Sequence, residues 1–257
     1  MRVSTPAKYD CLRRQTGLCG PGNNFRICMR MKSITDKKEI LVWDRATRAF
    51  HWTLVLMVAL CWLTSEAEGV LFWTHLVSGY GVLALVIFRL AWGFLGNRHA
   101  LFKGFVCGWT EVRDHAKGLM ALTPPRHIGH NPLGGWMIMT LLTGLVLVVA
   151  TGLFSADDGD AGPYAVLLSP KVADALSEIH EVLSSFLLAL ISVHVLGVVA
   201  DSLLGRENLV KALWTGVKRV AANEPENDAE EPSVWRLIVA LVLAAIGLAA
   251  VIWVAPV

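Results

Sequence analysis

Five long stretches of this sequence are apolar and almost free of charged residues, and they constrain the fold more than any other feature. A helix that spans a membrane needs about 20 consecutive, mostly apolar residues. We predict such helices at residues 46–64, 70–95, 133–154, 182–204 (beginning as early as Leu176) and 234–254. With 54% apolar and only 17% charged residues among 257, the chain is predicted to be an all-α integral membrane protein. The same composition excludes a disordered chain, and a net charge of +2 excludes a nucleic-acid binder that depends on bulk charge.

Lysine and arginine are distributed unevenly among the segments that connect the predicted spans. Eleven precede the first span, none lies in the first connection, five lie in the second, one in the third and four in the fourth. Positively charged residues accumulate on the cytoplasmic side of membrane proteins. We therefore expect the N-terminus in the cytoplasm and the C-terminus outside, and we use "inner" and "outer" below in this predicted sense.

Polar and acidic segments divide the chain into predicted domains. The N-terminal 39 residues are polar and lack the long apolar core of a signal peptide, so we expect a cytoplasmic extension, with Met29 and Met31 as candidate translation starts. An acidic linker bracketed by proline precedes the last span. The predicted parts are the extension (1–39), a four-helix unit (40–220), the linker (221–233) and an appended fifth helix (234–257).

The connection between the second and third spans contains a helical pattern of its own. Residues 101–122 repeat apolar side chains at helical spacing. This pattern is typical of an amphipathic helix that lies on a membrane surface, which here is the inner one. We expect His99 and His115 in this connection to be surface residues.

Four of the eight histidines lie in or at the rims of the first, second and fourth spans. An ionisable residue inside a membrane is costly and is a functional-site hypothesis by default. His180 and His194 are 14 residues apart. They therefore share one helix face and are separated by roughly 21 Å along the axis. This places His194 level with His51 near the inner surface and His180 level with His75 near the outer surface. We call His51 and His194 the inner pair, and His75 and His180 the outer pair.

Two facing imidazoles in an apolar bundle suit haem better than zinc. Zinc requires a third or fourth ligand, and only Cys61 lies at a suitable depth. A six-coordinate haem iron needs two axial ligands and apolar walls. Glycines near the histidines, and Ser184, would leave room for a macrocycle. However, small residues also promote plain helix packing. A single histidine at a membrane rim is more often an interfacial hydrogen-bonding residue than a ligand. Four histidines in two matched pairs nevertheless predict two haem b groups, one held by each pair.

Several charged or titratable residues are further candidates on the inner side. Arg89 follows His75 by 14 residues on the same helix face, so it lies near the predicted inner haem. It either pairs with a haem propionate or extends to the lipid headgroups. Arg45 and Arg48 have the same two interpretations, and extension to the headgroups is favoured for them.

Two histidines of the inner connection have a weaker functional interpretation. His127 and His130 precede the third span directly. They are candidates for protonating a quinone, and the alternative is that they are solvated loop or helix-start residues. At the outer side, the acidic run Asp157, Asp158 and Asp160 lacks the full spacing of a calcium loop and is predicted to be a solvated turn.

Several segments of the chain resemble the prokaryotic cytochrome b-561 family, which includes the membrane cytochrome b subunits of nickel–iron hydrogenases. The segments are VWDRATRAFHW, HLVSGYGVL, FRLAWGFLGNRHALF, GHNPLGGWMIMTLL and HEVLSSFLLALISVHVLG, which together cover roughly residues 40–220. The resemblance implies a bacterial inner-membrane protein whose haem ligands are His51, His75, His180 and His194. The fifth span and the long N-terminal extension depart from the family's four-helix core.

The predicted function is transfer of single electrons across the cytoplasmic membrane. The expected partners are membrane lipid, the quinone pool of a respiratory chain, and an outer redox protein such as a c-type cytochrome, which would dock on the third connection. The resemblance also admits a membrane anchor and electron-exit subunit of a larger oxidoreductase such as a hydrogenase, or oxidation of small external reductants including superoxide. A non-redox transporter that uses the histidines as proton relays would be colourless and would carry acidic residues deep in its spans, where this sequence has none.

Overall fold

The computed structural model describes residues 37–66, 69–122, 129–157, 160–221 and 231–254. The chain divides into two units: Met1–Ile40 with Lys218–Asp228, and Leu41–Val217 with Ala229–Val257. Strands β1 (Lys37–Leu41) and β4 (Val217–Ala221) pair in a two-stranded sheet, in which Arg219 Nε lies 3.0 Å from Glu39 Oε1. The candidate starts Met29 and Met31 and most of the predicted acidic linker lie outside the described residues.

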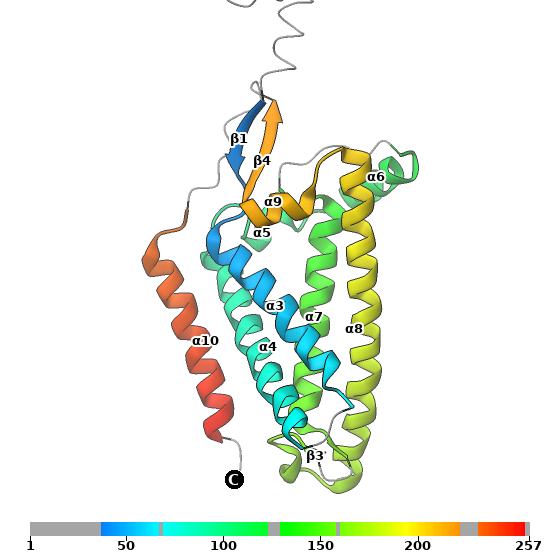
Figure 1. Cartoon of the computed structure of the whole chain (residues 1–257), viewed down its shortest axis with the longest axis vertical. Helices are drawn as coiled ribbons and strands as arrows, with labels where there is room; N and C mark the ends of the chain where they lie inside the picture. Colours follow the sequence, from blue (N-terminus) through cyan, green and yellow to red (C-terminus); the bar gives the residue numbers. More distant parts are fainter. Residues whose placement is uncertain (1–36, 67–68, 123–128, 158–159, 222–230, 255–257) are drawn as a thin grey trace, which may run out of the picture. The chain divides into compact units, whose positions relative to one another are not determined.

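Five helices of the second unit are long and apolar enough to cross a membrane, as the sequence predicted. They are α3 (Arg45–Leu63), α4 (Val70–Leu95), α7 (Pro132–Phe154), α8 (Pro170–Gly205) and α10 (Val234–Val254). Helix α3 packs on α4, α7 packs on α8, and α4 also contacts α7, so that these four form a bundle (Figure 1). The predicted all-α membrane fold is confirmed.

Local sequence explains where these helices begin. Helix α3 starts after Asp44, whose carboxylate accepts a hydrogen bond from the backbone N–H of Thr47 at 2.6 Å. Helix α7 starts in the same way after Asn131, with Pro132 in its first turn, where a missing N–H costs nothing.

Helix α8 is longer than the sequence predicted, because it begins at Pro170 rather than at residue 182 or 176. Its first turns carry the charged residues Lys171, Asp174 and Glu178, which lower the local hydropathy although the backbone is helical. Hydropathy marks the part of a helix that suits a bilayer, and it does not mark a polar extension of the same helix. The prediction of a late start was therefore wrong.

The inner-surface segment is two short helices instead of one continuous helix. Helix α5 (Phe102–Phe105) ends before α6 (Trp109–Met120), and α6 packs on α7. This contact buries Val112 and His115, and His115 is only 3% exposed. The expectation that His115 is a surface residue was therefore wrong, because its face of α6 meets a helix rather than water. His99 is half-buried, with its ring 6.4 Å from that of Trp43.

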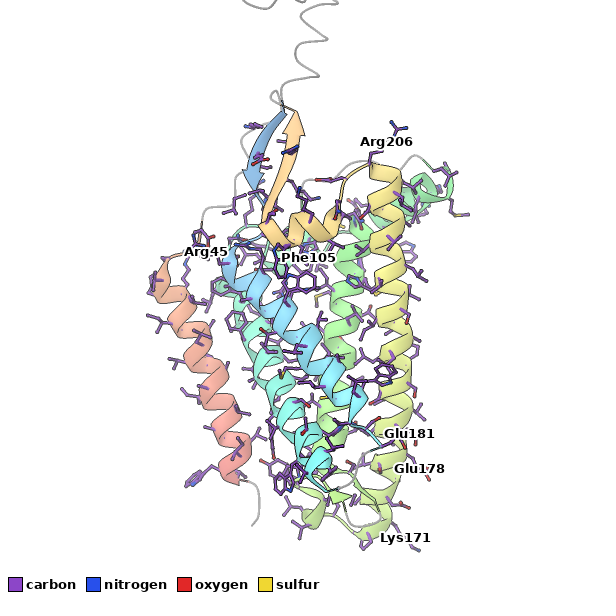
Figure 2. The ribbon with its side chains drawn as sticks, in the orientation of Figure 1. Arg45, Phe105, Lys171, Glu178, Glu181 and Arg206 are labelled. Carbon is purple, nitrogen blue, oxygen red and sulfur yellow. The ribbon has the colours of Figure 1, made fainter. Side chains whose placement is uncertain are left out.

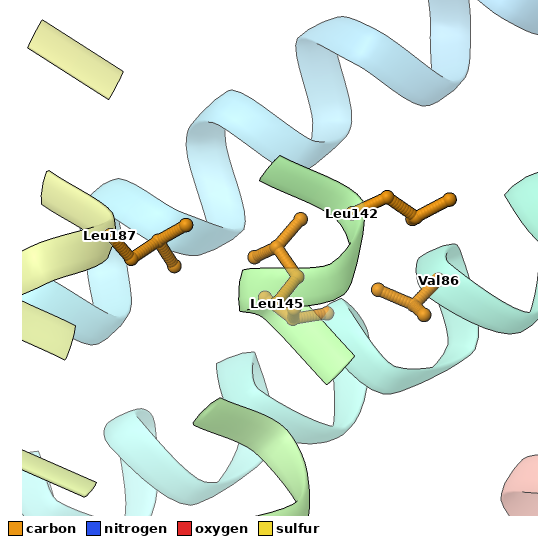
Figure 3. Close-up of a cluster of buried hydrophobic side chains, with 5 residues drawn as sticks. Val86, Leu142, Leu145 and Leu187 are labelled. Atoms are coloured by element: carbon orange, nitrogen blue, oxygen red, sulfur yellow. The ribbon is translucent and has the colours of Figure 1, made fainter. Parts of the chain in front are cut away.

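An apolar cluster fills the centre of the four-helix bundle. Val82 and Val86 of α4 meet Leu142 and Leu145 of α7 and Leu187 of α8 (Figure 3). Leu187 is seven residues from both His180 and His194 along α8. The cluster therefore lies between the depths of the outer and inner pairs and separates them with hydrocarbon.

Exposed tryptophans lie at both ends of the long helices. Tryptophan is enriched where a membrane meets water, because its ring is apolar and its N–H needs a polar partner. The exposed residues include Trp62, Trp73 and Trp253 at the predicted outer ends, and Trp214 and Trp235 toward the inner ends. Their positions agree with a bundle that crosses a bilayer along its helices.

Helix α10 packs on α4 through small residues. Ala240 and Ala244 are buried in a cluster with Phe88 and Trp92 of α4, and a Cβ at Gly247 would lie 2.7 Å from Ile87 Cδ1. Small residues allow close approach of membrane helices, where dispersion contacts replace the hydrophobic effect as the driving force. The fifth helix is therefore docked on the bundle and does not merely follow it in the chain.

We expect Ala244→Leu to destabilise the protein by about 1–3 kcal/mol, because the added atoms overpack the contact between α10 and α4. Thermal unfolding in detergent measures this effect. Ala245→Leu is the matched control, since Ala245 is exposed on the same helix. Equal stability of the two variants would contradict the described packing of α10.

Candidate functional site

The two histidines of the outer pair come together near one end of the bundle. His75 belongs to α4 and His180 to α8, and their ring centroids are 6.3 Å apart with the ring planes at 78°. His75 Nδ1 lies 2.9 Å from the Cys61 carbonyl oxygen, and His180 Nδ1 lies 2.9 Å from the Val148 carbonyl oxygen. Each ring is thus held by a backbone carbonyl from a neighbouring helix.

These two hydrogen bonds fix the tautomer of both rings. A carbonyl oxygen only accepts hydrogen bonds, so each Nδ1 must carry the proton and donate it. In a neutral imidazole the other nitrogen, Nε2, then has a lone pair and no proton. Metal-binding histidines commonly have this arrangement, with one nitrogen hydrogen-bonded and the other free to bind the metal.

The spacing of the outer pair suits two axial ligands of one iron. Two imidazoles bound to the same metal at about 2 Å per metal–nitrogen bond have ring centroids roughly 6 Å apart. Among the described residues, no group of three or more His, Cys, Asp or Glu side chains is placed to hold a metal ion. A zinc site is thus not favoured in this part of the chain, and the donor set fits a group that needs only two protein ligands.

Helix α7 approaches His180 closely through Gly152. A Cβ at Gly152 would lie 2.8 Å from His180 Cε1, closer than a side chain tolerates. Thr151, the preceding residue, has its Oγ1 3.3 Å from His180 Nδ1. On α4, an added Cβ at Gly79 would meet nothing within 4 Å. One side of the outer pair is therefore tightly packed, and another side has open space.

The inner pair is contributed by α3 and α8. His51 lies on α3 and His194 lies on α8. His51 Nδ1 is buried and has no hydrogen-bond partner among the described residues, and the Trp52 ring contacts the His51 ring edge-on at 5.2 Å. A Cβ at Gly197, one turn after His194, would meet nothing within 4 Å. The inner pair thus has room beside it, but among the described residues His51 lacks the kind of carbonyl partner that each ring of the outer pair has.

Arg89 is buried near the inner end of α4, with only 5% of its surface exposed. Its guanidinium lies over the rings of Phe102 and Phe105, 4.9 and 5.7 Å from their centroids. Its Nη1 is buried without a hydrogen-bond partner among the described residues. Extension to the headgroups is therefore not what the structure shows, and a buried guanidinium with a free N–H is suited to an anionic group such as a carboxylate.

Arg48 and Arg45 differ from each other in their surroundings. Arg48 donates from Nη1 to the Trp214 carbonyl oxygen at 2.7 Å, while its Nε is buried and lacks a partner in the described part of the chain. Arg45 has an exposed side chain and lies 3.8 Å from Glu231 at the start of α10. Arg45 and Arg206 mark the basic end of the bundle, and Glu178 and Glu181 mark the opposite end (Figure 2).

The segment that precedes α7 is anchored rather than solvated. His130 packs between the rings of Trp43 and Phe105, at 4.4 and 4.9 Å between ring centroids. Asn131 donates from Nδ2 to Asp201 Oδ2 of α8 at 2.5 Å. His130 directly precedes the capping residue of α7, which agrees with its interpretation as a helix-start residue rather than a solvated loop residue. His127 lies outside the described residues.

The family model for prokaryotic cytochrome b561 matches residues 42–216. This range contains α3, α4, α7 and α8 together with all four histidines of the two pairs. The chain belongs to the prokaryotic cytochrome b561 family. It is accordingly a multi-pass bacterial membrane protein and a b-type cytochrome that takes part in electron transfer, with haem b as its cofactor.

Matches to curated relatives extend over most of this cytochrome and over most of each relative. A protein from Azotobacter vinelandii is 23% identical over 227 residues, which cover 76% of this chain and 95% of the relative. A protein from Rhodobacter capsulatus is 22% identical over 219 residues, which cover 72% of this chain and 84% of the relative. Both are named probable Ni/Fe-hydrogenase B-type cytochrome subunit. No solved structure gives a significant match.

Two polar residues beside the outer pair of this cytochrome were not predicted from sequence. Ser78 accepts a hydrogen bond from Cys61 Sγ at 3.2 Å, and this contact joins the end of α3 to α4 next to the carbonyl that holds His75. Thr151 contacts His180 directly. Both are small polar residues in an apolar span at the depth of a histidine. That combination in the sequence could have indicated a contact with the histidine.

We expect Gly152→Ala to displace His180 and to remove one haem from the cytochrome, because the new methyl group overlaps the imidazole. The pyridine haemochrome assay on purified protein measures haem per chain. Gly144→Ala on the same helix is the control, since its added carbon would meet only the end of the flexible Leu187 side chain at 3.1 Å. An unchanged haem content in Gly152→Ala would contradict the expectation that haem binding requires His180 in its described position.

Proposed function

We propose that this cytochrome carries single electrons across the cytoplasmic membrane through two haem b groups. His75 and His180 would hold the outer haem, and His51 and His194 would hold the inner one. A bound haem b supplies one-electron chemistry between ferric and ferrous iron. The observation that carries the proposal is the outer pair, in which both Nδ1 protons are used by carbonyls and both Nε2 lone pairs remain for a metal.

The protein's own residues would orient and insulate the two groups. The cluster around Leu187 excludes water and polar groups from the space between the two pairs. Arg89 would donate a hydrogen bond from its free, buried Nη1 to a propionate of the inner haem. Arg48 Nε and Trp52 Nε1 on α3 are further buried donors that lack partners among the described residues. Three donors without acceptors favour an anionic group over plain apolar packing.

The proposed orientation has the N-terminus inside and the C-terminus outside. The lysine and arginine distribution supports it, as does the placement of Arg45 and Arg206 opposite Glu178 and Glu181 (Figure 2). Quinone would exchange electrons at the inner end, where His130 lies among aromatic rings. A quinone is a flat apolar ring with carbonyl oxygens, which aromatic side chains and a histidine proton donor suit.

An outer redox protein would exchange electrons at the opposite end. Asp174, Glu178 and Glu181 are exposed on the first turns of α8, and Glu181 adjoins His180 in sequence. Such a surface attracts a basic partner, of which a c-type cytochrome is the proposed example. The predicted docking residues Asp157, Asp158 and Asp160 belong to a turn that is described only in part.

The names of the relatives support a second candidate within the same class. If this cytochrome is the membrane subunit of a hydrogenase or a similar enzyme, the outer partner is a permanent subunit and the chain is its electron exit. The two candidates differ in whether the outer partner co-purifies with the cytochrome at stoichiometric amounts.

The central experiment is a reduced-minus-oxidised spectrum of the purified full chain, with haem quantified by the pyridine assay. We expect a b-type α band and about two haems per chain, since each pair of imidazoles occupies two axial positions. Replacing His75 or His180 by Ala should remove the outer haem and leave the inner one, and replacing His51 or His194 should do the reverse. A colourless protein, or loss of the same haem in all four variants, would refute the proposal.

The outer docking surface is tested by removing its charge. In the double variant Glu178→Gln with Glu181→Gln, we expect slower association with a basic c-type cytochrome at low salt, by about tenfold, because long-range attraction is weakened. Stopped-flow measurement of electron transfer from the reduced partner to the cytochrome at varied ionic strength gives the rate. Glu111→Gln, which removes an exposed charge at the inner end, should leave the rate unchanged, and an unchanged rate in the double variant would contradict docking at this surface.

A further inference from the structure

The Thr151 side chain forms a hydrogen bond with the His180 ring. Its hydroxyl donates to the carbonyl oxygens of Leu147 and Val148, each at 3.0 Å. Because this donation uses the only hydroxyl proton, the oxygen faces His180 Nδ1 with a lone pair at 3.3 Å. The His180 proton is thus shared between two acceptors, the Val148 carbonyl and the Thr151 hydroxyl.

We propose that Thr151 is a positioning residue that lowers the reduction potential of the outer haem, which rests on the proposed function of His180 as a haem ligand. Acceptors on Nδ1 pull its proton and make the imidazole a stronger electron donor through Nε2. A more basic axial ligand stabilises ferric over ferrous iron, so the haem gives up its electron more readily. The hydroxyl also limits rotation of the ring, since it holds Nδ1 from a second direction.

One histidine of the inner pair, His51, lacks such an acceptor. His51 Nδ1 is buried and has no acceptor in the described part of the chain. The hydrogen-bond acceptors at both outer Nδ1 atoms therefore make the outer site the more reducing of the two. An electron supplied by an outer donor would consequently move from the outer haem to the inner haem.

The test compares three variants of the purified full chain by equilibrium redox titration. Thr151→Val removes the acceptor while it keeps the branched shape, and Thr151→Ser restores the hydroxyl. Thr140→Val is the matched control, because Thr140 on the same helix makes the same type of bond to the carbonyl of Trp136 at 3.0 Å.

In Thr151→Val we expect the ferrous-to-ferric ratio of one haem at a fixed ambient potential to rise about threefold to tenfold, which is the range for one hydrogen bond. The haem that shifts should be the one that is lost in His75→Ala. Its low-temperature electron paramagnetic resonance signal should also move, since ring orientation changes. Thr151→Ser and Thr140→Val should titrate like the unsubstituted chain.

The outcomes separate this inference from the proposed function. If Thr151→Val keeps two haems with unchanged potentials, or shifts no more than Thr140→Val, the role of Thr151 is overturned while the haem ligands stand. Loss of the outer haem from Thr151→Val but not from Thr151→Ser supports the role, because the hydroxyl then holds His180 in place. An unsubstituted chain without haem overturns the proposed function itself.

Discussion

The structure depends on two hydrogen bonds in which imidazole N–H groups inside an apolar bundle donate to backbone carbonyls of neighbouring helices. The Cys61 carbonyl lies in the last turn of α3 and the Val148 carbonyl lies within α7, and they accept the imidazole protons of His75 and His180 respectively. A polar ring is tolerated in hydrocarbon only when its donor has a partner. The same bonds fix which ring nitrogen is free to bind a metal. One contact per ring therefore both satisfies the buried donor and leaves Nε2 available.

Close packing at the outer pair follows from this requirement. A carbonyl of α7 reaches the ring only if that helix comes very near His180, and the absence of a side chain at Gly152 allows it. Helix α10 covers the other face of α4 with alanines, so α4 is held from two sides while it presents His75 and Arg89. The apolar cluster around Leu187 separates the two pairs because Leu187 lies midway between His180 and His194 on the continuous helix α8.

The sequence predicted the large features because they follow from periodicity and hydropathy. All five spans were found, and the positions of four histidines on helix faces predicted two pairs, of which the outer is a close ring pair in the structure. The early start of α8, the break at residues 106–108 and the burial of His115 were missed, because they depend on tertiary contacts and on polar helix ends. The partners of His75 and His180 are backbone carbonyls, and no residue type marks a carbonyl in a sequence.

Unequal surroundings of the two pairs have a consequence for a protein in an energised membrane. In the proposed orientation an electron that moves from the outer to the inner pair moves toward the negative side, which costs about 2.3 kcal/mol for each 100 mV of membrane potential that it crosses. Equal potentials at the two haems would leave this cost uncompensated and would hold the electron outside. The proposed difference, a more reducing outer site with acceptors on both of its imidazoles, would offset this cost. The proposed asymmetry of hydrogen bonding is therefore what an inward electron path across a charged membrane would require.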